Sequence, residues 1–298
     1  MEKRDSFFRA GFVAVVGKPN VGKSTILNCL LNEHIFAVSS KPQTTRQQIK
    51  GILNLKNAQI VFLDTPGFLA PRYELQNRMI EYIKNALSNC DVVIVVTDAS
   101  SYESDYDKKV EALVKKSGKP KIVLFNKIDR LSNVDLANFT KENLQKDGFE
   151  KVLFVSAKDR IGLQNLVQEV KNLLPASEPL YDTSELSDSS SRFFAQEIIR
   201  EQIFVRLKKE IPYSSTVLVD TWSEFPNKIV ICATVYLEKN SQKKILIGAG
   251  GSLIKKIKIA AQKKLFKVVG KRIVLNLWVK TKRDWKDKSG SLNEFGYL

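Results

Sequence analysis

One eight-residue segment near the amino terminus constrains the fold more than any other feature of the sequence. Gly17-Lys-Pro-Asn-Val-Gly-Lys-Ser24 matches the pattern G-x-x-x-x-G-K-[ST], and it lies between a short apolar run and a segment with helical character. Glycines in such a loop let backbone N–H groups curl around a phosphate, and the N-terminus of the following helix favours negative charge. Lys23 can neutralise the β- and γ-phosphate oxygens, and Ser24 can offer its hydroxyl to Mg²⁺. The segment therefore predicts a strand–loop–helix unit that binds a nucleoside triphosphate.

The apolar pattern from Gly11 to about Leu174 predicts the architecture around this loop. Short continuous runs of Val, Ile, Leu and Phe alternate with helix-length segments. Continuous runs are typical of parallel strands buried on both faces, and strands that alternate with helices indicate a doubly wound α/β domain. Such domains bind ligands at the carboxyl ends of their strands. We expect strands at 12–16, 60–63, 92–96, 122–125 and 152–155, and helices at 23–31, 74–87, 105–117, 135–146 and 162–174.

Three further segments, each following a predicted strand, indicate which base is bound. In Asp64-Thr-Pro-Gly67, Asp64 can reach Mg²⁺ through a water and the Gly67 N–H can face the γ-phosphate. In Asn126-Lys-Ile-Asp129, the carboxylate can accept hydrogen bonds from N1–H and the N2 amino group of guanine, and adenine offers neither donor. In Ser156-Ala-Lys158, backbone N–H groups can meet the guanine O6. The four motifs in this order predict a GTPase, and Asp129 argues against the alternative of a P-loop ATPase.

The polar segment 41–48 is the predicted switch loop, from which one threonine must ligate Mg²⁺ and sense the γ-phosphate. Thr44 and Thr45 are both candidates. Phe68 occupies the position at which Ras-like GTPases carry a water-orienting Gln, so we predict slow intrinsic hydrolysis. The predicted contacts of GTP or GDP are Gly17, Lys18, Pro19, Asn20, Val21, Gly22, Lys23, Ser24, Thr25, Thr44, Thr45, Asp64, Thr65, Pro66, Gly67, Asn126, Lys127, Asp129, Ser156, Ala157 and Lys158. The predicted catalytic residues are Lys23, Thr45 and Gly67, and the predicted Mg²⁺ ligands are Ser24, Thr45 and, through water, Asp64.

The positive charge of the chain is concentrated in its last third. The formal net charge is +16; residues 1–191 carry 26 Lys and Arg against 23 Asp and Glu, and residues 192–298 carry 22 against 9. This excess predicts a polyanionic partner for the last third, and it weighs against the alternative of an evenly basic, solvated surface. We predict a GTPase domain at 1–175, an acidic Ser- and Pro-containing linker at 176–191, and an RNA-binding domain at 192–298.

The order of elements and a second glycine motif indicate the kind of RNA-binding domain. A helix (192–210), two strands (216–224 and 228–238), a helical pair and a last strand (272–280) give the order α-β-β-α-α-β. Gly248-Ala-Gly-Gly251 joins the paired helices, and in a KH domain a G-x-x-G loop clamps the backbone of single-stranded nucleic acid. The predicted RNA contacts are Gly248, Ala249, Gly250 and Gly251, with Lys243, Lys244, Lys255, Lys256 and Lys258.

Together these motifs resemble the Era family of bacterial GTPases, of the TrmE-Era-EngA-Septin-like class, which carry a C-terminal type II KH domain. The resemblance runs from about Gly11 to the end of the chain, and it includes Gln43–Arg46, Arg192–Glu201, Ile211–Tyr213 and Leu277–Lys280. It implies binding near the 3′ end of small-subunit ribosomal RNA, a role in the biogenesis of the small ribosomal subunit, and peripheral contact with the inner membrane.

The resemblance also bears on single residues. Thr45 is favoured over Thr44 because it directly precedes Arg46, as in related GTPases. Asn20 stands where related GTPases use an Asn to hold K⁺ against the phosphates; the alternative is that Asn20 only bonds within the loop. Ala249 and Gly250 depart from the KH pattern, in which a basic residue is common at these positions. Phosphate binding there would then depend more on backbone N–H groups and neighbouring lysines.

Composition also predicts where the protein acts. Three cysteines lie far apart in apolar surroundings, which indicates reduced thiols, and no apolar run is long enough to span a bilayer. We expect a cytoplasmic monomer with peripheral contact with the inner membrane. The alternative function is a membrane-associated regulatory GTPase whose basic C-terminal domain binds anionic lipid. Lipid binding should tolerate changes in the 248–251 loop, whereas RNA binding should not.

Overall fold

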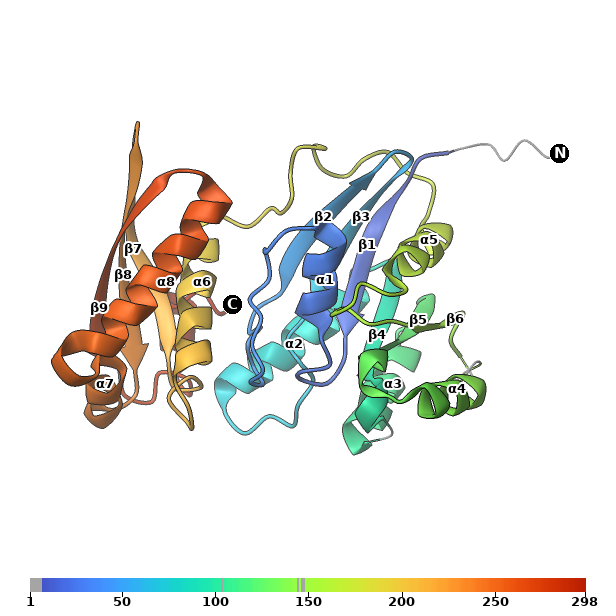
Figure 1. Cartoon of the computed structure of the whole chain (residues 1–298), viewed down its shortest axis with the longest axis horizontal. Helices are drawn as coiled ribbons and strands as arrows, with labels where there is room; N and C mark the ends of the chain where they lie inside the picture. Colours follow the sequence, from blue (N-terminus) through green and yellow to red (C-terminus); the bar gives the residue numbers. More distant parts are fainter. Residues whose placement is uncertain (1–6, 103, 144, 146–147) are drawn as a thin grey trace. The chain divides into compact units, whose positions relative to one another are not determined.

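The computed structural model describes residues 7–102, 104–143, 145 and 148–298. Contacts between residues divide the chain into two compact units, which Figure 1 shows in the colours of the sequence. The first unit contains Met1–Phe36, Thr45–Ala70 and Met79–Asp188, and the second contains Ala37–Thr44, Pro71–Arg78 and Ser189–Leu298. Two short segments of the expected GTPase domain are thus grouped with the last third of the chain, and the domain limits at 175 and 191 stay a prediction.

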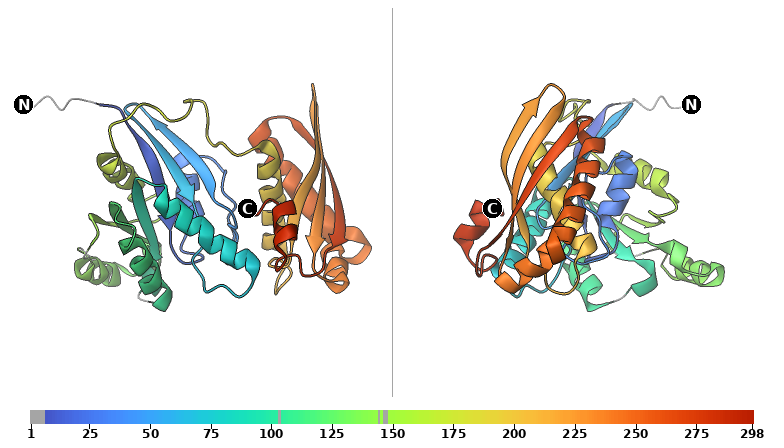
Figure 2. Two further views of the ribbon diagram at one scale, coloured as in Figure 1. Left: turned by 180° about the vertical axis from the view of Figure 1, so that it is seen from behind. Right: turned by 60° about the vertical axis from the view of Figure 1, so that its left-hand side comes forward.

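The first unit is built on a six-stranded sheet in the order β2-β3-β1-β4-β5-β6, in which all neighbours are parallel except β2 and β3. The strands are β1 (Arg9–Val16), β2 (Ile49–Leu55), β3 (Ala58–Asp64), β4 (Val92–Asp98), β5 (Lys121–Asn126) and β6 (Lys151–Phe154). The helices of this part of the chain are α1 (Lys23–Leu31), α2 (Glu74–Ser88), α3 (Asp105–Lys115), α4 (Asn133–Glu142) and α5 (Leu163–Leu173), with 3₁₀ turns η1 (Ala99–Ser101) and η2 (Ile128–Arg130). Figures 1 and 2 show α1 on one face of the sheet and α2 on the other. The predicted α/β fold class is confirmed.

Burial explains which strands the sequence reveals. Every residue of β3, β4 and β5 is buried, and each of these strands contains a continuous apolar run. The antiparallel edge strand β2 is absent from our prediction, which is wrong on this point. In β2 the apolar residues are interrupted by Lys50, Gly51 and Asn54, so no continuous run marks the strand. The predicted end of α4 at Lys146 lies outside the described residues.

The acidic segment after α5 lies along β2 and β3. The buried Gln59 side chain accepts hydrogen bonds from the N–H groups of Leu180 (2.7 Å) and Tyr181 (2.9 Å), and it donates to the Tyr181 carbonyl (2.8 Å). Farther along, the N–H of Ile52 donates to the carbonyl of Leu186 at 2.9 Å. Because a buried amide side chain without partners is costly, these hydrogen bonds hold the segment 180–186 on the first unit.

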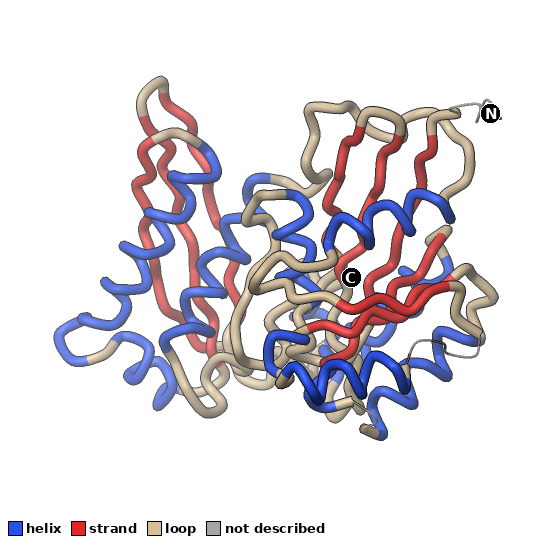
Figure 3. Tube along the Cα trace, turned by 45° about the vertical axis from the view of Figure 1, so that its right-hand side comes forward, coloured by secondary structure: helices blue, strands red, loops and turns tan. Residues whose placement is uncertain are grey.

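The second unit contains a three-stranded sheet in the order β7-β8-β9, with β7 and β8 antiparallel and β8 and β9 parallel. Its elements are α6 (Ser191–Arg206), β7 (Thr216–Phe225), β8 (Lys228–Leu237), α7 (Asn240–Ile247), the 3₁₀ turn η3 (Ala249–Gly251), α8 (Ser252–Val269), β9 (Arg272–Thr281) and α9 (Ser289–Glu294). Figure 3 shows the strands of both sheets in red. Helices α6 and α8 pack on the same face of the three-stranded sheet and enclose its apolar core. The order α-β-β-α-α-β of the predicted KH domain is confirmed.

The C-terminal segment, which the prediction did not resolve into elements, covers part of the opposite face of this sheet. In the right-hand view of Figure 2, α9 lies across the sheet from α8. The rings of Tyr236 on β8 and Phe295 are 4.8 Å apart, and the indole N–H of the buried Trp285 donates to the Ser214 carbonyl at 3.0 Å. None of the helices in the described ranges is both long and apolar enough to cross a membrane.

Candidate nucleotide-binding and RNA-binding sites

The predicted phosphate loop lies between β1 and α1, with Thr25 in the first turn of α1. Gly22 has a φ of 101°, and a Cβ added there would lie 2.3 Å from the amide nitrogen of Asn126. This close approach admits only glycine. The Asn126 amide donates to the Val21 carbonyl at 2.8 Å, so the loop is fastened directly to the end of β5.

Lys23 is buried beneath this loop. Its ammonium group donates hydrogen bonds to the carbonyls of Gly17 (3.2 Å) and Lys18 (3.1 Å). Burial lowers the pKa of Lys23 to about 8, although the Asp64 carboxylate opposes that shift. A bound phosphate would supply the negative charge that the buried ammonium group lacks.

Three predicted Mg²⁺ ligands come together beside Lys23. The Ser24 hydroxyl donates to Asp64 Oδ2 at 2.8 Å, the Thr45 hydroxyl donates to the same oxygen at 3.2 Å, and the two hydroxyls are 3.2 Å apart. The Thr44 hydroxyl instead donates to the Lys41 carbonyl at 2.8 Å. Of the two candidate threonines, Thr45 therefore shares a site with Ser24 and Asp64, and Thr44 does not.

The buried carboxylate of Asp64 fits a hard cation. Its Oδ1 atom is buried and has no hydrogen-bond partner in the described part of the chain. Burial raises the pKa of Asp64 to about 6, against the lowering effects of Lys23 and of the Ser24 and Thr45 hydroxyls. Mg²⁺ is bound through oxygen ligands and retains waters, so a carboxylate oxygen without a partner beside two hydroxyls suits it.

The predicted base-binding segments meet at the same edge of the sheet. Asn126 Oδ1 accepts a hydrogen bond from the Ala157 N–H at 3.1 Å. The Ser156 hydroxyl donates to Asp129 Oδ1 at 2.8 Å, and Lys158 Nζ lies 3.9 Å from Asp129 Oδ2. Asp129 is thus oriented by the loop after β6, with a carboxylate that can accept from guanine.

Sequence reasoning missed two carboxylates that hold motif lysines. Lys127 donates to Asp98 Oδ2 at 2.7 Å and also to the Asn20 carbonyl. Burial would raise the pKa of Asp98, but hydrogen bonds from Lys127 and Ser100 outweigh it, and the pKa is lowered. Lys18 donates to Asp107 Oδ2 at 2.8 Å. Asp98 ends the buried strand β4, and this position could have identified it as a site residue. Nothing in the sequence distinguishes Asp107 from the other acidic residues of α3.

The turn after β3 packs directly on the phosphate loop. The Phe68 N–H donates to the Gly17 carbonyl at 3.0 Å, and the Thr65 hydroxyl donates to the Val15 carbonyl at 2.7 Å. A Cβ added to Gly67 would lie 2.7 Å from Cα of Pro19 in the phosphate loop. The Phe68 side chain packs against the apolar core between the sheet and α2 and α3. It therefore occupies a structural position and offers no hydrogen bond to a water.

The predicted RNA-clamping loop lies at the N-terminus of α8. Gly248 has φ 75° and ψ 169°, and a Cβ added there would lie 2.9 Å from Cβ of Leu253. A Cβ added to Gly250 or Gly251 would meet nothing within 4 Å, and Ala249 is exposed. Backbone can therefore approach a phosphate closely at this loop. Lys243 and Lys244 lie in the preceding α7.

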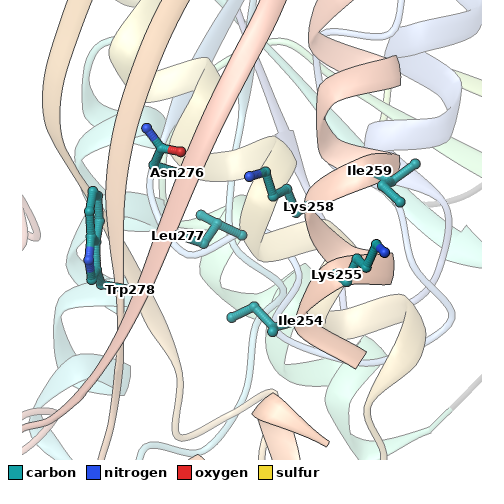
Figure 4. A pocket seen from close by; sticks show the side chains of 7 residues that line it. All are labelled: Ile254, Lys255, Lys258, Ile259, Asn276, Leu277 and Trp278. Carbon is teal, nitrogen blue, oxygen red and sulfur yellow. The ribbon is translucent and has the colours of Figure 1, made fainter. Parts of the chain in front are cut away.

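A groove of about 540 Å³ lies between α8 and β9 in the second unit (Figure 4). The residues that line it are Ile254, Lys255, Lys258, Ile259, Asn276, Leu277 and Trp278. The predicted contacts Lys255 and Lys258 are among them, whereas Lys256 is exposed elsewhere on α8. The β9 side of the groove was not predicted as a contact, because the extended pattern of a strand does not tell which residues flank a groove.

Two family models match the chain. One described as a 50S ribosome-binding GTPase matches residues 12–127, and one described as a KH domain matches residues 210–286. Among curated relatives, the chain is 38% identical over 292 residues to the GTPase Era of Bordetella avium, covering 97% of this chain and 98% of the relative. It is 36% identical over 291 residues to the GTPase Era of Halothermothrix orenii, covering 97% and 99%.

Solved structures of similar proteins span the same length. A crystal structure of Era in complex with MgGDPNP and nucleotides 1506–1542 of 16S ribosomal RNA matches with a TM-score of 0.92 and 33% identity, covering 98% of this chain and 99% of that one. A single-residue variant of Aquifex aeolicus Era bound to GDP·AlF4⁻ matches with a TM-score of 0.94 and 33% identity, covering 98% and 100%. The chain belongs to the Era family, enzymes that bind and hydrolyse GTP with Mg²⁺ and join a P-loop GTPase domain to a KH domain.

Proposed function

We propose that this chain is a GTP-dependent switch that binds the 3′ end of small-subunit ribosomal RNA and acts in the biogenesis of the small ribosomal subunit. The observation that carries the proposal is the union of two sites in one chain. Four guanine-nucleotide motifs meet at one edge of the first sheet, and the second unit has a lysine-flanked groove beside a G-x-x-G loop. A similar protein was solved with nucleotides 1506–1542 of 16S ribosomal RNA, which supports the choice of RNA.

In the nucleotide site, we assign binding of the β- and γ-phosphates to the phosphate loop and Lys23. Ser24, Thr45 and Asp64 would hold Mg²⁺, which neutralises developing charge on the transferring phosphoryl group. The hydroxyl cluster at Asp64 supports Thr45 over Thr44 as the switch threonine. The Gly67 N–H, next to Pro19, is assigned to the γ-phosphate.

Asp129 is the residue on which base selection depends in this proposal. Asp129→Asn should weaken GTP binding by about 10- to 150-fold, because it removes a charged hydrogen bond of roughly 1.5–3 kcal/mol. It should also shift preference towards xanthosine triphosphate, since xanthine has a carbonyl where guanine has its amino group. Titrations with labelled GTP and XTP measure both effects. Asp135→Asn, which removes an exposed carboxylate from α4, is the matched control. A GTP affinity within about threefold of wild type would rule out this base pocket.

We also propose that Asn20 holds K⁺ at the phosphates and so compensates in part for the absence of the water-orienting Gln of Ras-like GTPases. Phe68 cannot orient a water, because its side chain packs in the apolar core. The Asn20 carbonyl is already positioned by a hydrogen bond from Lys127. Hydrolysis should be faster in K⁺ than in Na⁺ at equal ionic strength, and Asn20→Ala should remove the difference. Equal rates in the two salts for the wild-type protein would exclude the potassium role.

The G-x-x-G loop generates the corresponding prediction for RNA. The double substitution Ala249→Asp and Gly250→Asp puts negative charge where we place a phosphate, so affinity for single-stranded RNA should fall more than about tenfold while GTP affinity is kept. A charge-matched control, Ser223→Asp with Asn227→Asp, alters exposed positions of the β7–β8 hairpin. Neutralising Lys255 and Lys256 should weaken RNA binding moderately and reduce its salt slope by about 0.7 per lost phosphate contact. If the loop variant and the charge-matched control lost the same RNA affinity, the loop would not clamp RNA.

The same variants separate RNA from the second candidate, an anionic membrane surface. That candidate is favoured by Phe266 and Val268, which are 53% and 51% exposed on α8 beside Lys263 and Lys267. Binding to anionic vesicles should survive the loop substitution, because a lipid surface needs the lysines and apolar side chains but not the loop.

We propose a cytoplasmic monomer with peripheral contact with the inner membrane.

A further inference from the structure

The three tryptophans of this protein have different surroundings, and only two of them are explained by packing. Trp285 is buried, and its indole N–H donates to the Ser214 carbonyl at 3.0 Å. Trp222 packs against the apolar core of the second unit, and its N–H donates to Glu224 Oε1 at 2.9 Å. Trp278 is 49% exposed, and its N–H has no partner in the described part of the chain. The half-exposed ring and the N–H of Trp278 are therefore accessible to a ligand.

Trp278 lies where the groove opens. It belongs to β9, an edge strand of the sheet, and it is one of the residues that line the groove. Figure 4 shows Leu277 pointing from β9 towards α8, whereas Asn276 and Trp278 lie on the other side of the strand. This follows from the alternation of side chains along a strand. A bound polymer that leaves the groove over the edge of β9 would therefore meet the indole ring next.

The charges of the groove and of β9 favour a nucleic-acid occupant. Lys255 and Lys258 line the groove on the α8 side, and Lys280 follows Trp278 by two residues on the same face of β9. The lining of the groove includes no Asp or Glu. An apolar protein partner would need further exposed apolar side chains, but the same-face neighbours of Trp278 along β9 are Asn276 and Lys280. Aromatic rings beside basic side chains are typical of sites at which bases of a single strand stack.

We propose that Trp278 is a stacking platform for one RNA base at the edge of the groove. The single-stranded site would then extend around the edge of β9, beyond the nucleotides that the groove itself holds. This inference rests on the proposed RNA binding of the second unit, and it adds a contact on the sheet face opposite α8. Base–aromatic stacking contributes about 1–3 kcal/mol per base, which corresponds to about 5- to 150-fold in affinity.

The test uses the full chain with a GTP analogue, and RNA corresponding to nucleotides 1506–1542 of 16S ribosomal RNA as the probe. Trp278→Ala should lower affinity about 5- to 150-fold, and Trp278→Phe should retain most of it, because a phenyl ring still stacks. Phe225→Ala is the matched control. Phe225 is 47% exposed, and its ring centroid lies 5.5 Å from the Lys228 ammonium group. It pairs with Lys228 at the start of β8, six residues before Thr234, which pairs with Trp278. Its removal should leave affinity within about twofold of wild type.

Fluorescence supplies a second readout that does not depend on the alanine variant folding. Stacking should quench the indole emission of the wild-type protein on RNA addition, and Trp278→Phe should abolish the quenching while RNA still binds. If wild type does not bind the RNA, the proposed function fails. If wild type binds without quenching, or Trp278→Ala binds as tightly as wild type, RNA binding stands and the stacking role is overturned.

Discussion

The structure of the nucleotide site depends on one buried carboxylate, that of Asp64. It ends β3, receives hydrogen bonds from Ser24 at the start of α1 and from Thr45 in the switch region, and keeps one oxygen without a partner in the described residues. Burial of a carboxylate is expensive, and it raises the pKa of Asp64 to about 6 despite Lys23 and the two hydroxyls. A cation at this point relieves it. The arrangement thus joins strand, phosphate loop and switch threonine around a place for Mg²⁺.

A second interaction fixes the distance between the phosphate end and the base end of the site. Asn126 donates to the Val21 carbonyl in the phosphate loop and accepts from the Ala157 N–H in the loop after β6. A single amide side chain therefore spans both ends, and Gly22 leaves the space that it needs. Because β1, β4, β5 and β6 are parallel neighbours, their carboxyl ends lie along one edge, and the motifs that follow them meet without long connections.

The motifs and the parallel strands were predictable because each depends on local sequence. A buried parallel strand reads as an apolar run, and a phosphate loop needs glycines at fixed spacing. Strand β2 was missed because Lys50 and Asn54 interrupt its apolar pattern. On one side it is bonded to the segment that contains Leu186, a contact that the sequence of β2 does not reveal. That segment was predicted from composition as a linker, but its attachment to the first unit depends on Gln59, which is remote in sequence.

Residues whose role arises only from three-dimensional proximity were beyond the sequence. Asp98 and Asp107 hold the motif lysines Lys127 and Lys18, and neither pairing follows from spacing along the chain. In the second unit, the lysines near the G-x-x-G loop could be named from the sequence. Which of these lysines line the groove and which face only solvent could not be predicted. Trp278 belongs to a segment that supports the family resemblance, yet only its exposure and its place on the edge strand indicate a contact.

The most direct test of the Mg²⁺ site compares two adjacent threonines. The affinities of Thr45→Ala and Thr44→Ala for a GTP analogue and for GDP should be measured with Mg²⁺ and with Mg²⁺ removed by a chelator. Thr45→Ala should weaken Mg²⁺-dependent binding of the GTP analogue by about 10- to 150-fold and leave GDP affinity nearly unchanged, because the switch threonine senses the γ-phosphate. Thr44→Ala should resemble wild type, since its hydroxyl bonds to the Lys41 carbonyl. Loss of the GTP analogue by Thr44→Ala, with its binding retained by Thr45→Ala, would contradict the assignment of Thr45 to Mg²⁺.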